Sequence, residues 1–98
     1  MARSITPILL PSSPEINTLA DLGAFIRSQR THQGLRIDDA ASLCKVSVQL
    51  FSDLENGSRA VGLDKALGVA QKFGLTLLAV TPEQLPFALQ ALRRSESP

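Results

Sequence analysis

Apolar residues recur with helical spacing from the first quarter of the chain onward. In the first run they stand at Leu19, Leu22 and Ile26. Thr18 precedes this run as a residue type that caps helices, and Asp21 follows three residues later, near the positive end of the helix dipole. The pattern predicts a first helix from Thr18 to about Thr31, which Gly34 terminates.

Two further short helices are predicted after Leu35, joined by a tight turn. One face of the second helix is made by Ile37, Ala40, Ala41 and Cys44. Lys45 and Val46 form the turn, and Ser47 caps the third helix. The third helix is expected to bury Phe51 and Leu54. Asn56 and Gly57 together are a strong signal for its end.

The C-terminal third of the chain predicts a helix, a strand and a last helix. The fourth helix begins near Leu63 and ends at Gly74, and its expected buried face comprises Leu63, Ala66, Leu67, Ala70 and Phe73. Residues 75–80 form a short apolar run between a glycine and a proline, which is typical of a strand. The last helix is expected over 83–94, with Pro86 in its first turn.

The first 17 residues differ from the rest because three prolines and four serine or threonine residues interrupt any helical period. We expect a flexible arm over 1–17, whose apolar stretch 5–10 can dock on another protein or on a second subunit. The other expected segments are a helical domain at 18–74, a dimerisation strand at 75–81, and a C-terminal helix and tail at 82–98.

A two-stranded pairing across a dimer is expected because a single strand has no partner within this chain. Its backbone donors and acceptors would stay open, and six mostly apolar residues would be exposed. The same strand of a second subunit, related by a two-fold axis, can pair with it antiparallel. The expected dimerisation residues are Leu75, Thr76, Leu77, Leu78, Ala79 and Val80.

Composition narrows the class of protein. The 98 residues suggest one domain, and the single cysteine, Cys44, excludes an internal disulfide or a multi-cysteine metal site. No apolar run approaches the ~18 residues of a membrane span, and no secretory leader pattern stands at the start. We therefore expect a soluble, cytoplasmic protein that does not contact membranes.

Catalysis and cofactors are not expected. His32 is the only histidine and lies near a helix end, and Cys44 occupies a core position. No paired carboxylates, phosphate loop or metal-ligand spacing is present.

Charge and the third helix point instead to nucleic acid. The net charge is only +1, but basic residues cluster around the helix pair at Arg27, Arg30, Arg36, Lys45 and Arg59, with Arg93 and Arg94 at the end. The outer face of the third helix carries Val48, Gln49, Ser52 and Asp53. Glutamine can bond adenine, valine can contact a thymine methyl, and aspartate can accept from cytosine. An ordinary solvated polar face is the alternative interpretation.

These residues give the chain a resemblance to the Cro/repressor-type (XRE) helix-turn-helix family over about residues 19–74. The matching segments are Gly-Ala-Phe-Ile-Arg-Ser-Gln-Arg at 23–30, Gly-Leu at 34–35, Asp-Asp-Ala-Ala at 38–41, Val-Ser at 46–47 and Leu-Glu-Asn-Gly at 54–57. The resemblance implies a mainly α, lambda-repressor-like bundle that binds double-stranded operator DNA. The strand-like segment after it is similar to that of HipB-type antitoxins, which repress their own operon and bind a HipA-type serine/threonine kinase toxin.

Residue by residue, the resemblance implies that Ser47 caps the recognition helix. The side chains expected to face bases or nearby phosphates are Val48, Gln49, Ser52 and Asp53. Arg30 and Glu55 correspond to an ion pair between the first helix and the recognition helix, and Asn56 and Arg59 lie in the loop that approaches the DNA backbone. The basic residues Arg27, Arg36 and Lys45 complete the expected DNA-binding set.

Three positions depart from the family pattern. Ile37 stands where a polar, phosphate-contacting glutamine is usual, Lys45 replaces the usual turn glycine, and Leu43 is apolar where the family is polar. Together with Asp53 and the low net charge, they leave two alternatives to a repressor-antitoxin. One is a free-standing repressor of the same fold, and the other is a protein-interaction module whose helix-turn-helix no longer reads DNA.

Overall fold

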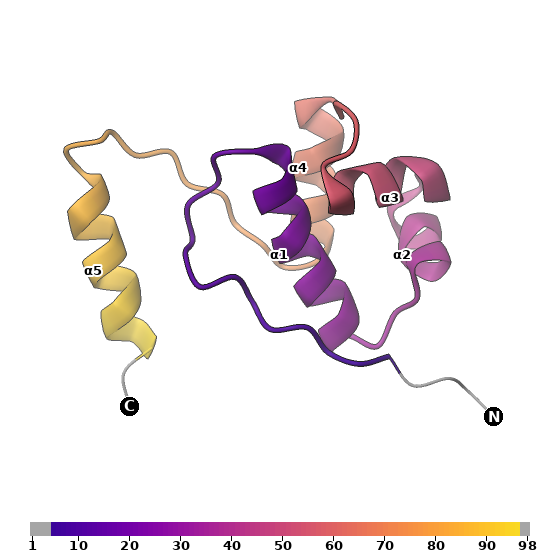
Figure 1. The fold of residues 1–98 in the computed structure, drawn as a ribbon, viewed down its shortest axis with the longest axis horizontal. Helices are drawn as coiled ribbons and strands as arrows, with labels where there is room; N and C mark the ends of the chain where they lie inside the picture. The colour runs from indigo at the N-terminus through magenta and orange to yellow at the C-terminus, as the bar shows by residue number, and fades with distance from the viewer. Residues whose placement is uncertain (1–4, 97–98) are drawn as a thin grey trace.

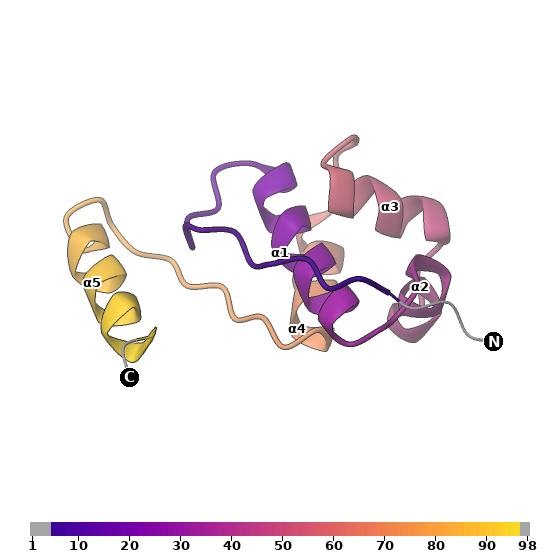
Figure 2. The same ribbon diagram turned by 60° about the horizontal axis from the view of Figure 1, so that its bottom comes forward.

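The computed structural model describes residues 5–96, and over that range it contains five α-helices (Figure 1). They are α1 (Leu19–His32), α2 (Ile37–Cys44), α3 (Val48–Asn56), α4 (Leu63–Lys72) and α5 (Leu85–Glu96). The first four pack into one bundle, whereas α5 stands apart at the end of a stretched connection (Figures 1 and 2). The predicted mainly α fold class is confirmed. No helix among the described residues is long and apolar enough to span a membrane.

The start of α1 is fixed by a reciprocal cap. The Thr18 hydroxyl accepts a hydrogen bond from the Asp21 backbone N–H at 3.2 Å, while the Asp21 carboxylate accepts from the backbone N–H of Thr18 at 3.0 Å and of Asn17 at 2.8 Å. The bonds from Asn17 and Thr18 favour the ionised form and hold the pKa of the Asp21 carboxyl below its ordinary value. The predicted helix start is therefore confirmed.

The turn between α2 and α3 has the backbone geometry that a glycine adopts most easily. Lys45 has φ 59° and ψ 42°, in the left-handed region. The N–H groups of Lys45 and Val46 donate to the carbonyls of Ser42 and Ala41, at 3.1 and 3.0 Å, and close the end of α2. A side chain in this conformation costs about 1 kcal/mol relative to glycine. Ser47 then caps α3 by accepting from the Leu50 N–H at 3.0 Å, as predicted.

The core lies between the first four helices, each of which contributes buried residues. Its buried apolar residues are Leu22, Ile26, Ala40, Ala41, Phe51, Leu54, Ala66, Val69, Ala70 and Phe73. The rings of Phe51 and Phe73 meet edge to face with centroids 5.9 Å apart. Leu63, which we expected on the buried face of α4, is 70% exposed. The reason is that the apolar spacing identifies which face of a helix is buried. It does not show which positions along that face are covered by neighbouring helices.

The contact between α1 and α3 is made through a glycine. Gly23 is buried in α1, and a Cβ atom built there would overlap the carbonyl oxygens of Leu54 and Glu55. Both are backbone atoms of α3, so they cannot rotate away as a side chain would. The two helices therefore touch backbone to backbone at this point.

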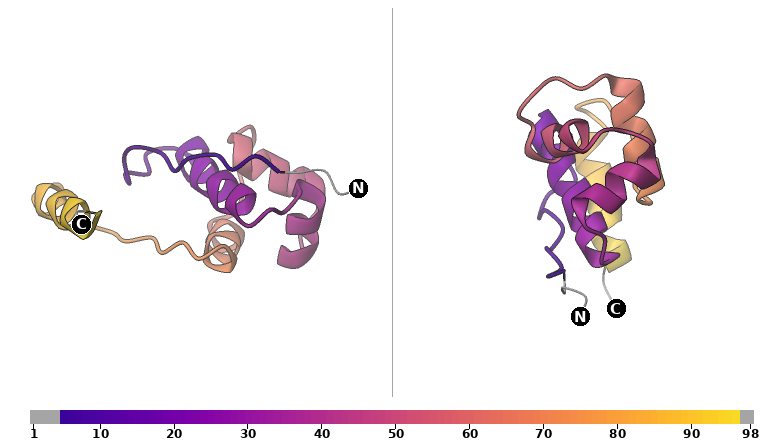
Figure 3. Two further views of the ribbon diagram at one scale, coloured as in Figure 1. Left: turned by 90° about the horizontal axis from the view of Figure 1, so that it is seen from below. Right: turned by 90° about the vertical axis from the view of Figure 1, so that its right-hand side faces the viewer.

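The arm lies along α1 and is bonded to it at Ile8 (Figure 3). The Ile8 N–H donates to the Thr31 hydroxyl at 3.0 Å, and the Ser28 hydroxyl donates to the Ile8 carbonyl at 2.6 Å. Ser28 and Thr31 are both buried, and the Thr31 hydroxyl also donates to the Ser28 carbonyl at 3.0 Å, so the bonds to Ile8 extend a set of buried hydrogen bonds within α1. The apolar stretch that we expected to dock on another protein thus contacts its own helix.

The strand expected at 75–80 is absent from the described part of the single chain. After the Leu75 N–H donates to the Ala70 carbonyl at 2.9 Å, the chain runs on without regular structure to α5. The physical reason is that a strand needs a second strand to bond, and none is present within residues 5–96. Exposed side chains of this segment include Leu77, Leu78 and Val80. The helix after it begins at Leu85 rather than 83, with Pro86 in its first turn as predicted.

Two glycine-to-alanine substitutions should separate close packing from helix propensity. Gly23→Ala should lower the free energy of unfolding by about 2–3 kcal/mol or more, because the new methyl group displaces the α3 backbone. Gly68→Ala is the matched control, since Gly68 lies in α4 with open space around it, and alanine there should add about 0.5–1 kcal/mol. Urea denaturation measures both, and equal effects would contradict the backbone contact.

Candidate nucleic-acid interface

One face of α3 begins at the turn that joins it to α2 and ends beside α1. Val48, Ser52 and Asn56 are spaced four residues apart, so they lie along one side of the helix. The Asn56 amide donates to the Ser52 hydroxyl at 3.3 Å, which links two of these positions. Val48 is exposed at the start of this face. Of the predicted base-facing residues, Val48 and Gln49 are exposed in the first turn of α3, whereas Ser52 and Asp53 are half-buried.

Gln49 and Asp53 are engaged with each other rather than free. The Gln49 amide donates to the Asp53 carboxylate at 2.9 Å, and the same oxygen accepts from the Ser58 hydroxyl at 3.0 Å. These bonds turn Asp53 toward its own chain, where its charge is partly compensated. A glutamine amide has two N–H donors, so the bond to Asp53 leaves Gln49 one donor for a base edge, and its amide oxygen has no partner among the described residues.

The structure brings Arg30 and Glu55 together as a bidentate pair. Arg30 Nε lies 2.6 Å from Glu55 Oε2, and its terminal nitrogen donates to Oε1 at 3.0 Å. The Glu55 side chain is 1% exposed and that of Arg30 is 12% exposed. Arg30 also donates to the Leu35 carbonyl at 2.9 Å, so one side chain ties α1 to α3 and to the loop before α2.

Arg27 extends this network to the surface. Its Nε lies 3.4 Å from Glu55 Oε1, and its guanidinium donates to the Asn56 side-chain oxygen. Arg36 lies across from it and makes only a long, exposed contact to Asp38, 3.6 Å between Nε and Oδ1. Between them is an open groove of about 480 Å³, lined by Ile5, Ile8, Arg27, Arg30, Arg36, Ile37, Glu55 and Asn56. Guanidinium groups beside an apolar wall suit an anionic, planar or phosphate-like partner.

The other predicted residues lie around α3 and not in this groove. Lys45 is exposed at the turn before α3, and Arg59 is exposed in the loop after it. The Ser47 hydroxyl is occupied by its cap bond. The site is thus split between the start of α3 and the groove at its end.

Several functional features escaped the sequence analysis. The apolar groove wall comes from the arm, through Ile5 and Ile8, and the clamp for the arm comes from Ser28 and Thr31. Neither pair shows a local pattern, because each depends on residues about 20 positions apart. Cys44 is half-buried, and burial raises the pKa of its thiol, which keeps it protonated. No group of three metal-ligating side chains is found among the residues described.

Removing the charge of Glu55 should be far more costly than removing that of an exposed acid. Glu55→Gln keeps the shape but leaves the Arg30 cation buried without a counter-charge, so the free energy of unfolding should fall by about 2–4 kcal/mol. Asp38→Asn, which breaks the exposed pair with Arg36, should cost less than about 1 kcal/mol. Thermal and urea denaturation measure the difference. Similar losses in the two variants would mean that the buried pair does not fix α3.

Comparison with known proteins places this arrangement in a family. Residues 21–83 match the family described as "Helix-turn-helix domain". The chain is also 36% identical over 67 residues to y4mF of Sinorhizobium fredii (strain NBRC 101917 / NGR234), named an uncharacterized HTH-type transcriptional regulator. This alignment spans 68% of the present chain and 88% of that relative. The matched residues include all of α2, α3 and α4, and the chain belongs to the helix-turn-helix domain family.

Proposed function

We propose that the protein is a transcriptional regulator that binds operator DNA and represses from it. The observation that carries this proposal is the exposed start of α3, on a helix whose other end is held by a buried ion pair and lies beside a cationic groove. The name of the Sinorhizobium relative, a transcriptional regulator of the HTH type, supports the same role. Such a protein acts in the cytoplasm, where it is associated with the nucleoid when bound to DNA.

In this proposal α3 enters the major groove of the DNA. Some of its residues contact bases, and residues around it contact the phosphate backbone. Val48, Gln49 and Ser52 contact base edges, with the Gln49 amide pairing with an adenine. Residues expected to contact the phosphate backbone are Arg27, Arg36, Lys45, Asn56 and Arg59. Asp53, held by Ser58, accepts from a cytosine amino group or stays directed toward the protein.

The proposal includes a homodimer joined by strand pairing. The support is the exposure of the 75–80 segment, in which Leu78 is 76% exposed and the backbone between α4 and α5 lacks regular structure. Antiparallel pairing of two such segments supplies the missing backbone partners and buries part of the apolar surface. The two recognition helices would then stand about 34 Å apart, one DNA turn, on a palindromic operator.

We propose further that the repressor is the antitoxin of a HipA-like serine/threonine kinase. The support is the resemblance of the chain to HipB-type antitoxins, together with Leu43, an exposed apolar residue on α2. A free-standing repressor of the same fold is the second candidate.

Purified protein should inhibit the kinase encoded beside its gene, and Leu43→Ser should weaken that inhibition without affecting DNA binding. A repressor without a kinase neighbour would contradict the antitoxin role alone.

Base reading should depend on Gln49 and phosphate binding on Arg59. Gln49→Ala should weaken operator binding by about 1–3 kcal/mol and leave binding to random DNA unchanged. Arg59→Ala should weaken binding to both and reduce the salt slope by about one. Gln71→Ala, at an exposed position of α4, is the control and should change neither. Salt-titrated fluorescence anisotropy measures these effects. An unchanged operator preference in Gln49→Ala would reject the docking, and an absence of DNA binding would favour the interaction module.

The dimer should depend on the backbone donor at position 78. Leu78→Pro removes that N–H from the ladder and should give monomers with little operator affinity. Leu78→Val keeps both the donor and an apolar, strand-forming side chain, so it should stay dimeric. Sedimentation equilibrium distinguishes the two. A dimeric Leu78→Pro protein would show that the segment is not the interface.

A further inference from the structure

Asp53 stands at a position where an acidic side chain is unfavourable for two reasons. It opens the last turn of α3, where the helix dipole favours cations. It also follows Gln49 by one turn, on the part of the helix that is proposed to approach DNA phosphates, which repel a carboxylate. A residue that breaks local rules in this way calls for a compensating role, and its hydrogen bonds supply one.

The first of these bonds fixes the orientation of Gln49. The Gln49 side-chain amide donates to Asp53 Oδ1 at 2.9 Å, across one turn of α3. An ionised carboxylate can only accept, so the amide nitrogen must face it and the amide cannot be turned end for end. The second N–H and the amide oxygen have no partner among the described residues. They form a donor beside an acceptor, which is the pattern that pairs with N7 and N6 of adenine in the major groove.

Ser58 holds Asp53 through two contacts. Its hydroxyl donates to Asp53 Oδ1 at 3.0 Å, and its backbone N–H donates to the Asp53 carbonyl at 3.1 Å. Oδ1 therefore accepts from both Gln49 and Ser58, and the two bonds offset part of the charge that Asp53 would present to DNA. The side chains at positions 49, 53 and 58 thus form one chain of hydrogen bonds.

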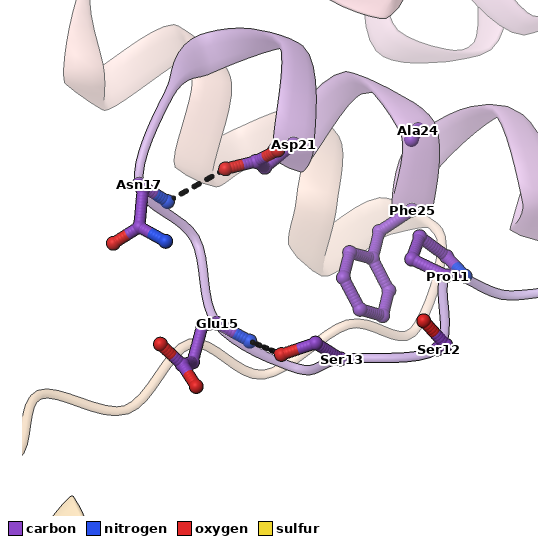
Figure 4. A pocket seen from close by; sticks show the side chains of 8 residues that line it. All are labelled: Pro11, Ser12, Ser13, Glu15, Asn17, Asp21, Ala24 and Phe25. Atoms are coloured by element: carbon purple, nitrogen blue, oxygen red, sulfur yellow. Dashed lines mark hydrogen bonds between the residues drawn. The ribbon is translucent and has the colours of Figure 1, made fainter.

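The turn that carries Ser58 rests on α1. Gly57 has φ 63°, and a Cβ atom built there would lie 2.7 Å from backbone atoms of Ala20, in the first turn of α1. That turn is fixed by its cap, in which the Asn17 N–H donates to the Asp21 carboxylate at 2.8 Å (Figure 4). Ser58 is therefore exposed but has an ordered support.

We infer that Asp53 and Ser58 are positioning residues that set an adenine preference through Gln49. Ser58 fixes the carboxylate, the carboxylate fixes the amide, and the amide meets the base with its donor and acceptor already placed. Because an ordered side chain loses less entropy on binding, the pairing is strengthened without a further contact to DNA. The inference rests on the proposed function, in which α3 enters the major groove, and it assigns Asp53 no base of its own.

The hydrogen bonds are tested first in the protein without DNA, by NMR relaxation of side-chain amide nitrogens. The Gln49 amide should be ordered in the wild type and, in Asp53→Ala, as mobile as that of Gln71, an exposed glutamine of α4. Asp53→Asn keeps an acceptor oxygen and should restore the order, whereas Ser58→Ala should loosen the amide by less than Asp53→Ala. A wild-type Gln49 amide as mobile as that of Gln71 would overturn the inference, whatever the protein binds.

Selection from duplexes with a random central sequence tests the base preference. The wild type should select adenine at the position where Gln49→Ala loses its preference, and Asp53→Ala should weaken this preference about 3- to 10-fold. The two effects should not add in the double variant, because Asp53 acts only through Gln49.

Affinity for random DNA separates positioning from a loss of folding. Asp53→Ala removes a negative charge and should bind random DNA more tightly than the wild type, whereas a damaged α3 would weaken all binding. Asp64→Ala, which removes an equal charge from the first turn of α4, is the matched control and should leave the base preference unchanged. Weaker binding of Asp53→Ala to random DNA would contradict a positioning role.

The selection distinguishes failure of the inference from failure of the proposed function. If the wild type selects no sequence, both are wrong. If Gln49→Ala changes the selected base and Asp53→Ala does not, DNA reading stands and the inference alone is overturned. It is also overturned if Asp53→Ala changes the preference at a different base pair, which would show direct pairing of Asp53, or if the base selected through Gln49 is not adenine.

Discussion

α1 and the end of α3 meet backbone to backbone at Gly23, and the position of α3 depends on that contact. Gly23, Arg27 and Arg30 follow one another at i, i+4 and i+7, so all three lie on the face of α1 that meets α3. The missing side chain at Gly23 lets α3 come close enough for Glu55 to reach both guanidinium groups. The close backbone contact and the ion pairs thus lie at the same α1–α3 interface, and both favour the same orientation of the two helices.

The cationic groove arises from unequal pairing and not from an excess of basic residues. One buried carboxylate, Glu55, serves two arginines, Arg30 fully and Arg27 at longer range. The least compensated charges of the groove are therefore those of Arg27, whose contact with Glu55 is long, and of Arg36, whose contact with Asp38 is long and exposed. This arrangement explains how a chain with a net charge of only +1 presents a surface suited to an anion.

The sequence predicted what local signals encode. The caps at Thr18 and Ser47, the turn at Lys45 and the stops near Gly57 and Gly74 each depend on a few adjacent residues, and α1 to α4 were placed from them. The apolar spacing likewise identified most of the core, including Phe51, Leu54 and Phe73.

What escaped prediction depends on contacts between distant segments. Gly23 in a helical pattern suggests only a loss of propensity, because the backbone it meets is some 30 residues away. The clamp on Ile8 and the Asp53–Ser58 contact have no periodic signature. The strand predicted at 75–80 is absent from residues 5–96 for a different reason, because a strand forms only beside a second strand and this range contains none.

The way the arm is held restricts its sequence in an unexpected place. The hydrogen bonds to Ser28 and Thr31 use the peptide N–H and carbonyl of Ile8, so these two residues do not recognise its side chain. The bonds therefore do not select among side chains at position 8, but they exclude proline, which has no N–H to donate. Pro7 stands directly before it, and a slip of the arm by one residue would bring that proline opposite Thr31. Pro7 thus helps to set the register of the arm on α1, because it excludes the alignment that is shifted by one residue. This selection does not depend on recognition of any side chain of the arm.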